Sequence, residues 1–201
     1  MTSEPYGDRS VPTPTIDVAA WEAALLRLLE DVYTLARSGP RLHEDWAEDV
    51  LAVMERSVAD PRDWSGRDSE TFEVGREAGY PFFPFRALTA EDLHAGLRPI
   101  TAGAAVELLA SLAQEWFFEG SPVRSREDRD AVLADARTLL DRFGPDTAFW
   151  TSSDLARTCD APDFLARDLE GGHPFTDFMM DLGLIAVSAD EVGVFWSFNA
   201  H

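Results

Sequence analysis

Apolar side chains recur every three or four residues near the start of the chain, which is the spacing of one helix face. The pattern begins after Asp17, a suitable N-cap residue, and stops at the Ser-Gly-Pro sequence of residues 38–40. Its members are Val18, Trp21, Leu25, Leu28, Leu29, Val32 and Leu35. A second helix is predicted over residues 43–58, and the short connection predicts that the two helices pack antiparallel as an αα-hairpin.

Three more helical patterns precede residue 144. Thr89 and Asp92 have the spacing of a capping box, which predicts a short helix that ends before Pro99. Longer helices are predicted over residues 101–118 and 125–143, where apolar residues again share one side.

After Gly144 the spacing of apolar residues changes from the helical period to the alternation of β-strands. Residues 147–151 predict a short strand, and residues 183–188 and 192–198 flank a turn as the strands of a hairpin do. Between these strands, residues 160–171 and 176–180 predict two further helices. One face of the last strand is predicted to pack on helices, and the apolar Phe195 predicts partial cover of the other face. The residues of the first face are Val192, Val194, Trp196 and Phe198.

These patterns together predict an α+β fold: a predominantly helical single domain with a small antiparallel sheet that includes a C-terminal β-hairpin. Residues 1–15 contain three prolines and no apolar period, which predicts a flexible N-terminal arm. The single domain then covers 16–201, with a helical part over 16–144 and a mixed part over 145–201.

Residues 59–88 form the longest predicted connection, and it is rich in proline and glycine. Its aromatic sequence around Tyr80, Phe82 and Phe83 has two interpretations. The rings form a stiff lid over the core, or they are exposed anchors for a partner. We keep Tyr80, Phe82 and Phe83 as candidate partner-binding residues.

The chain is strongly acidic, because it contains 37 aspartates and glutamates but only 17 lysines and arginines. All 17 of these basic residues are arginine. The absence of lysine excludes Walker-type phosphate loops, Schiff-base enzymes, Ser-x-x-Lys acylases and protein kinases. A net charge of −20 argues against nucleic acid and anionic membranes as partners, because both repel such a surface. A basic protein is the partner that this charge favours.

The second predicted helix carries the clearest acidic face, opposite its apolar stripe. One interpretation is an ordinary solvated face whose first-turn acids interact favourably with the helix dipole. The other is a docking surface for a cationic partner, because aligned like charges destabilise a helix slightly unless a partner neutralises them. The candidate partner-binding residues on this face are Glu44, Asp45, Glu48, Asp49 and Glu55.

Complete catalytic and metal-binding patterns were not found in the sequence. Glu91 and His94 form half of a di-metal helix motif, but its second copy is absent. Glu22 lies within the apolar arc of the first helix, and the single Cys159 follows no nucleophile motif. We therefore expect no catalytic residue, no metal site and no cofactor.

The sequence leads to two functional hypotheses, beside a third interpretation in which the protein is a housekeeping or structural domain whose acidity serves only its solubility. The first is a non-enzymatic, cytoplasmic, bacterial interaction protein that binds and neutralises a basic partner, as an inhibitor or immunity protein neutralises a toxin. Its lone cysteine and the absence of a signal-peptide pattern support the cytoplasmic expectation. The alternative is an enzyme or small-molecule-binding protein with a pocket between the helices and the C-terminal hairpin, under the 59–88 connection. His94, His173, Asp177 and Glu22 are the polar side chains expected in that pocket.

Overall fold

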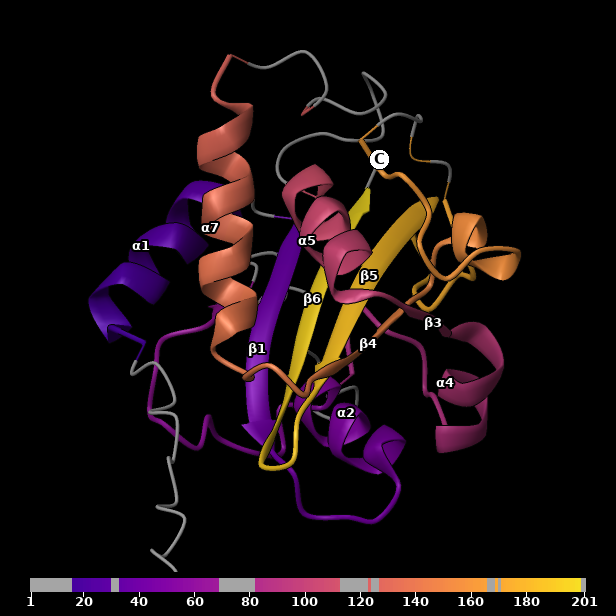
Figure 1. The fold of residues 1–201 in the computed structure, drawn as a ribbon. Coiled ribbons are helices and arrows are strands. Elements are labelled where there is room, and N and C mark those ends of the chain that lie inside the picture. Colours follow the sequence, from indigo (N-terminus) through magenta and orange to yellow (C-terminus); the bar gives the residue numbers. More distant parts are fainter. Residues whose placement is uncertain are drawn as a thin grey trace, which may run out of the picture.

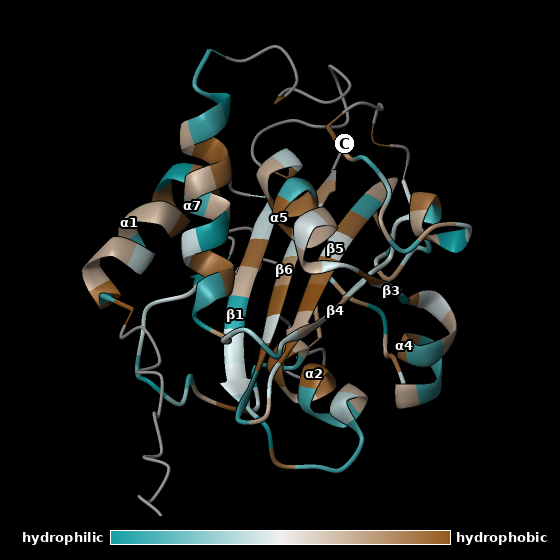
Figure 2. Ribbon diagram, in the orientation of Figure 1, coloured by the Kyte–Doolittle hydropathy of each residue, from teal (hydrophilic) through white to brown (hydrophobic). Residues whose placement is uncertain are grey.

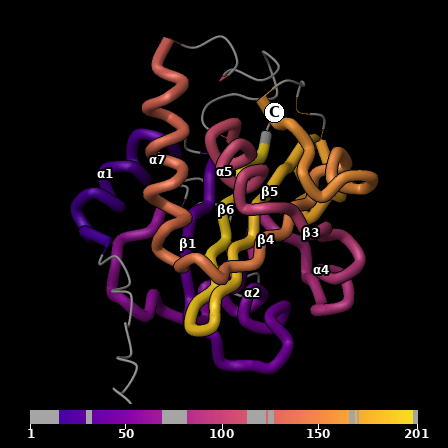
Figure 3. The backbone as a smooth tube through the Cα atoms, viewed as in Figure 1, coloured from indigo at the N-terminus to yellow at the C-terminus, as the bar shows by residue number. Residues whose placement is uncertain are grey.

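An antiparallel sheet of six strands lies at the centre of the computed structural model (Figure 1), in the order β2-β1-β6-β5-β4-β3. The structure describes residues 16–29, 33–68, 82–112, 123, 127–165, 169 and 171–199. The strands are β1 Thr34–Pro40, β2 Arg67–Asp68, β3 Arg98–Ile100, β4 Ala148–Thr151, β5 Met180–Val187 and β6 Glu191–Asn199. The last two form the predicted hairpin, and Figure 3 shows the tight turn that joins them.

Helices cover both faces of this sheet. On one face, α1 (Val18–Leu28), α5 (Ala102–Ser111) and α7 (Arg129–Asp141) pack around a core that includes Phe195. On the other face, α2 (Trp46–Met54) and α4 (Ala90–Gly96) pack on a second core that includes Trp196. A short 3-10 helix, η2 (Asp154–Arg157), follows β4. None of the helices in the described part of the chain is long and apolar enough to cross a membrane.

Strand β6 shows how one sequence serves both cores, since successive side chains point to opposite faces. The predicted helix-facing set lies in the α2–α4 core, and its members are Val192, Val194, Trp196 and Phe198. Phe195 lies in the other core, only 1% exposed, so the predicted cover of the second face is confirmed. Figure 2 shows long hydrophobic segments along β5 and β6 between the two helical layers.

The prediction of a small sheet is wrong, because β1, β2 and β3 add three strands to those expected from the sequence. The sequence pattern places residues 34–37 in the first helix and ends it at residues 38–40, yet all seven residues pair with β6. Leu35 packs into one core and Ala36 into the other, which is the alternation of a strand buried on both faces. Long-range pairing therefore overrides the local helical period.

The αα-hairpin is also wrong, because β1 separates α1 from α2 and places them on opposite faces of the sheet. Two later helix predictions fail as well. The described residues 160–165 contain no helix, and Met180 begins β5 instead of ending a helix. The whole predicted N-terminal arm (residues 1–15) lies outside the described residues, as do Tyr80 and residues 113–118 of the predicted 101–118 helix.

The capping box at the start of α4 is confirmed. The Thr89 hydroxyl accepts a hydrogen bond from the Asp92 amide at 3.2 Å, and the Asp92 carboxylate accepts one from the Thr89 amide at 2.8 Å. This arrangement satisfies two backbone donors that would otherwise lack partners at the helix end.

Thr89→Ala should lower the free energy of unfolding by about 1 kcal/mol, because the variant loses the N-cap acceptor. Urea unfolding followed by circular dichroism measures this change. Thr138→Ala is the matched control, since its hydroxyl donates to the Ala134 carbonyl within α7 and caps nothing. Equal effects of the two substitutions would contradict a capping role for Thr89.

Candidate functional site

The first turn of α2 lies beside α4 and beside Trp150 of β4. Together they form an acidic surface that contains aromatic rings. We call it the α2–α4 surface. Its residues are Glu44, Asp45, Trp46, Glu48, Glu91, His94 and Trp150.

Asp45 connects the two helices of this surface. It is the N-cap of α2, where its carboxylate accepts a hydrogen bond from the Ala47 amide at 3.0 Å. The same carboxylate lies 2.9 Å from Nε2 of His94 on α4. These contacts, with the His94 hydrogen bond first, lower the pKa of Asp45 below its ordinary value. Asp45 thus remains charged and joins the helices at the surface.

A stack of rings lies next to this contact. The indole of Trp46 stacks on that of Trp150 with centroids 4.5 Å apart, and His94 meets Trp46 edge-on at 5.0 Å. Both tryptophans are half-buried, so part of each ring remains accessible. Half-buried tryptophans held in a fixed geometry are suitable anchors for a binding partner.

The glutamates around these rings are exposed. Glu44, Glu48 and Glu91 form no ion pair with an arginine among the residues that the structure describes. The nearest basic group to Glu48 is Nε2 of His43, at 3.9 Å. The surface therefore presents carboxylates whose charge is not matched by any guanidinium group in the described part of the chain.

Asp49 differs from the other acids of α2, because its side chain is only 1% exposed. Its carboxylate accepts hydrogen bonds from the Arg41 guanidinium at 2.7 Å and from the Leu42 amide at 3.0 Å, and it lies 2.7 Å from Nδ1 of His43. Burial raises the pKa of Asp49, but these hydrogen bonds outweigh burial and leave it below the ordinary value. Asp49 orders the segment before α2 and offers no accessible carboxylate.

The remaining predicted binding residues lie away from the α2–α4 surface or outside the described residues. Glu55 is half-buried at the end of α2, and burial raises its pKa. Phe82 and Phe83 are half-buried against the α2–α4 core, and Phe83 meets Phe178 edge-on at 5.9 Å. These two rings therefore act largely as a lid over the core, while Tyr80 lies outside the described residues.

The side chains of the alternative pocket do not meet in one site. His94 contacts Asp45, and Asp177 pairs with Arg86 at 2.9 Å. Glu22 accepts a hydrogen bond from the Ser65 amide, on the opposite side of the sheet from His94. His173 packs edge-on against Phe175. Each of the four has its own local contacts.

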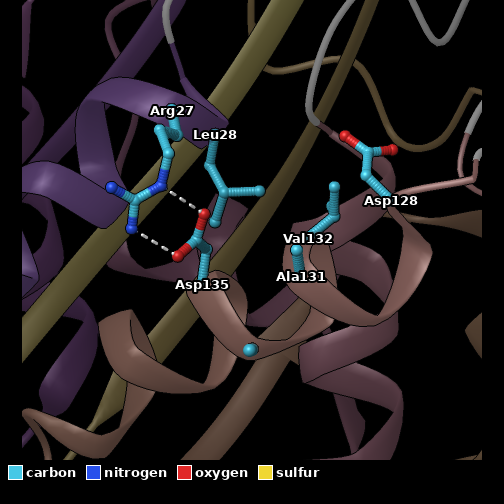
Figure 4. Close-up of a pocket in the computed structure, with 7 residues that line it drawn as sticks. Arg27, Leu28, Asp128, Ala131, Val132 and Asp135 are labelled. Atoms are coloured by element: carbon cyan, nitrogen blue, oxygen red, sulfur yellow. Dashed lines mark hydrogen bonds and ion pairs between the residues drawn. The ribbon is translucent and has the colours of Figure 1, made fainter.

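On the other side of the sheet, which α1 and α7 cover, described residues line two cavities. One, of about 310 Å³, lies between α1 and α7, and Figure 4 shows Nε and one terminal nitrogen of Arg27 directed at the Asp135 carboxylate beside it. Arg27 and Asp135 therefore neutralise each other's charge. The other, of about 180 Å³, lies between β1 and residues 59–66. Within the described ranges, no group of three or more metal-ligating side chains is found.

Neither a protein-family model, nor a curated protein, nor a solved structure matched the chain in the comparisons. The functional argument therefore depends on the side chains described above. The sequence indicated the acids of α2, but it did not indicate that Glu91 and Trp150 would join them. Only the packing of α4 and β4 beside α2 brings these residues together.

Proposed function

We propose that this protein is a non-enzymatic interaction protein that binds a basic partner protein through the α2–α4 surface and neutralises it. The observation that supports this most strongly is the distribution of ion pairs. Eight arginines of the described residues pair with carboxylates of the same chain: Arg27, Arg37, Arg41, Arg56, Arg62, Arg86, Arg142 and Arg157.

These internal pairs leave an excess of carboxylates at the surface. With a net charge of −20 and many guanidinium groups already paired, the exposed charge is dominated by acids such as Glu44, Glu48 and Glu91. A surface of this kind raises the association rate of a cationic protein and selects against anionic ones. Complementarity of charge thus defines the class of partner.

The rings of the surface add affinity to this selection. Trp46 and Trp150 are held by stacking, so little side-chain entropy is lost when a partner covers them. A lysine or arginine of the partner that lies over an accessible indole forms a cation–π interaction with the ring. The same cation also forms ion pairs with the neighbouring carboxylates. Inhibitors and immunity proteins that guard a cytoplasm against a basic nuclease toxin have these requirements, and we propose that role.

The triple variant Glu44→Gln, Glu48→Gln, Glu91→Gln should lose the basic partner. Tagged wild-type protein is incubated with a lysate of the source cell at about 50 mM and about 1 M salt, since high salt screens exposed charges. We expect the wild-type protein to retain a basic protein at low salt and release it at high salt. Mass spectrometry identifies the retained protein, and titration calorimetry with that purified protein should show at least about tenfold weaker binding by the variant.

The matched control is Glu127→Gln, Asp130→Asn, Asp141→Asn, which removes three exposed carboxylates at α7 on the opposite face. It changes the net charge by the same amount but leaves the α2–α4 surface intact. The control should retain the partner at wild-type affinity. Equal weakening by both triple variants, or the retention of no basic protein by the wild type, would overturn the proposal.

A further inference from the structure

The cavity between β1 and residues 59–66 contains polar side chains that the proposed function does not use. Arg37 and Ser38 line it from the strand, and Asp60, Asp63 and Trp64 line it from the segment. It lies beneath part of the connection that the sequence predicts to roof a pocket, but its wall is β1 instead of the C-terminal hairpin.

The Ser38 hydroxyl at this cavity has no hydrogen-bond partner among the described residues. The residue is 5% exposed, and its buried Oγ atom forms no hydrogen bond with any part of the chain that the structure describes. Ala36, two positions earlier on the same face of β1, packs in the apolar core as expected. A buried hydroxyl without a partner is unfavourable, so this position favours an occupant that forms a hydrogen bond with it.

The carboxylates around the cavity differ in whether a described guanidinium holds them. The Arg142 guanidinium holds Asp60 through two hydrogen bonds of 2.7 Å. Asp68 accepts hydrogen bonds from Arg56 at 2.7 and 2.9 Å and from Arg37 at 3.3 Å. The exposed carboxylate of Asp63 lines the cavity and forms no ion pair within the described ranges, so it is the group there that a cationic ligand can pair with.

The size of the cavity allows more than one water molecule. Its volume of about 180 Å³ is several times the ~30 Å³ that a water molecule occupies in the liquid. Trp64, half-buried against the core, supplies an apolar wall beside the two polar groups. The lining thus combines a hydrogen-bonding hydroxyl, an anionic group and an apolar surface.

We propose that this cavity binds the primary ammonium group of a small alkylamine. In the proposed complex, the ammonium donates one hydrogen bond to Ser38 Oγ and another to the Asp63 carboxylate, and the short alkyl chain packs on Trp64. This ligand site is separate from the α2–α4 surface, which lies on the other side of the sheet. The same ammonium chemistry is offered by a free amine and by a lysine side chain.

Propylammonium chloride is the probe, titrated into the ¹⁵N-labelled full chain and followed by two-dimensional NMR. We expect saturable shifts confined to the amides of residues 37–38 and 59–66. Propanol and propionate, which match its size without its charge, should cause no saturable shift. A parallel titration with Nα-acetyl-lysine methylamide separates the sources: binding of both amines supports a lysine side chain as ligand, and binding of propylammonium alone supports a free amine.

Two substitutions test the assigned roles. Asp63→Asn should weaken propylammonium binding at least about tenfold, because a charge-assisted hydrogen bond is lost. Asparagine also tolerates the left-handed backbone of residue 63, where φ is 58°. Ser38→Ala should weaken binding about three- to tenfold.

Asp160→Asn, with the same charge change beside β3 at the other edge of the sheet, should bind as the wild type does. The absence of saturable binding, equal binding of propanol, or equal effects of Asp63→Asn and Asp160→Asn would overturn the proposal.

Discussion

Arg142→Met should lower the free energy of unfolding by about 3–5 kcal/mol, because it leaves the Asp60 carboxylate without its cation and leaves Glu191 paired with Arg62 alone. The Arg142 side chain is 0% exposed and bonds Asp60 twice and Glu191 once, at 2.7, 2.7 and 2.8 Å. Its guanidinium carbon also lies 4.8 Å from the Trp64 ring centroid and 5.2 Å from that of Trp21. Urea unfolding monitored by circular dichroism measures the change.

Two further variants separate the unpaired charges from a loss of packing. Arg137→Met changes an exposed arginine of the same helix and should alter the free energy of unfolding by no more than about 0.5 kcal/mol. Adding Asp60→Asn to Arg142→Met should recover at least half of the loss, because Asp60 is the carboxylate that Arg142→Met leaves unpaired, while Glu191 keeps Arg62. If the double variant is no more stable than Arg142→Met, packing and not charge explains the effect.

This ion-pair cluster also explains why residues 59–66 have a defined position without regular secondary structure. Arg142 at the end of α7 holds Asp60 and also pairs with Glu191 at the start of β6, and the Trp64 ring packs on the guanidinium and on Trp21. The wall of the Ser38 cavity is therefore fixed by buried contacts. A preorganised wall lowers the entropy lost when a small ligand binds.

The elements that the sequence predicted well have strong local signals. Thr89 and Asp92 specify the start of α4 through contacts three residues apart, and the alternation from Val192 to Phe198 specifies β6. The first strand has no such signal, because Leu35 and Ala36 are both apolar and continue the stripe of the preceding helix. Its strand conformation comes from pairing with β6, more than 150 residues later in the chain.

At the candidate site, too, the sequence predicts local spacing but not contacts between distant segments. Helical spacing placed Glu44 and Glu48 together, since they are one turn apart. The same spacing could not show that Asp49 turns inward, because Arg41 and the Leu42 amide that hold it precede the helix. The cation and the backbone donors, and not the helix periodicity, determine that burial.

Asp181→Asn should lower the free energy of unfolding by about 2–3 kcal/mol. The Asp181 carboxylate, 3% exposed on β5, accepts hydrogen bonds from four donors. These donors are the Phe175 amide, the Thr176 amide and hydroxyl, and Nε1 of Trp196. An asparagine presents an NH₂ group in place of one oxygen, so at least one buried donor loses its acceptor.

The loop held by Asp181 supports the proposed binding surface. Phe175 packs on Trp196 at 5.3 Å and lies against Gly96, where an added Cβ would approach its ring to 2.4 Å. Because Gly96 is the last residue of α4, Asp181→Asn should also loosen that helix. Faster amide exchange in residues 90–96 would report this effect. Asp177→Asn, whose side chain is 79% exposed, is the control and should leave exchange and stability unchanged.

The pH dependence of the Asp181→Asn penalty tests the environment of the carboxylate. Burial raises the pKa of Asp181 above its ordinary value of 3.8, in spite of the four donors. The folded state therefore binds the proton more tightly than the unfolded state, and this stabilisation is present below pH 3.8 and lost as pH rises through the folded pKa. Asparagine does not titrate, so the stability difference between the wild type and Asp181→Asn should widen on acidification towards pH 3.8. A difference that narrows would show that the four hydrogen bonds outweigh burial.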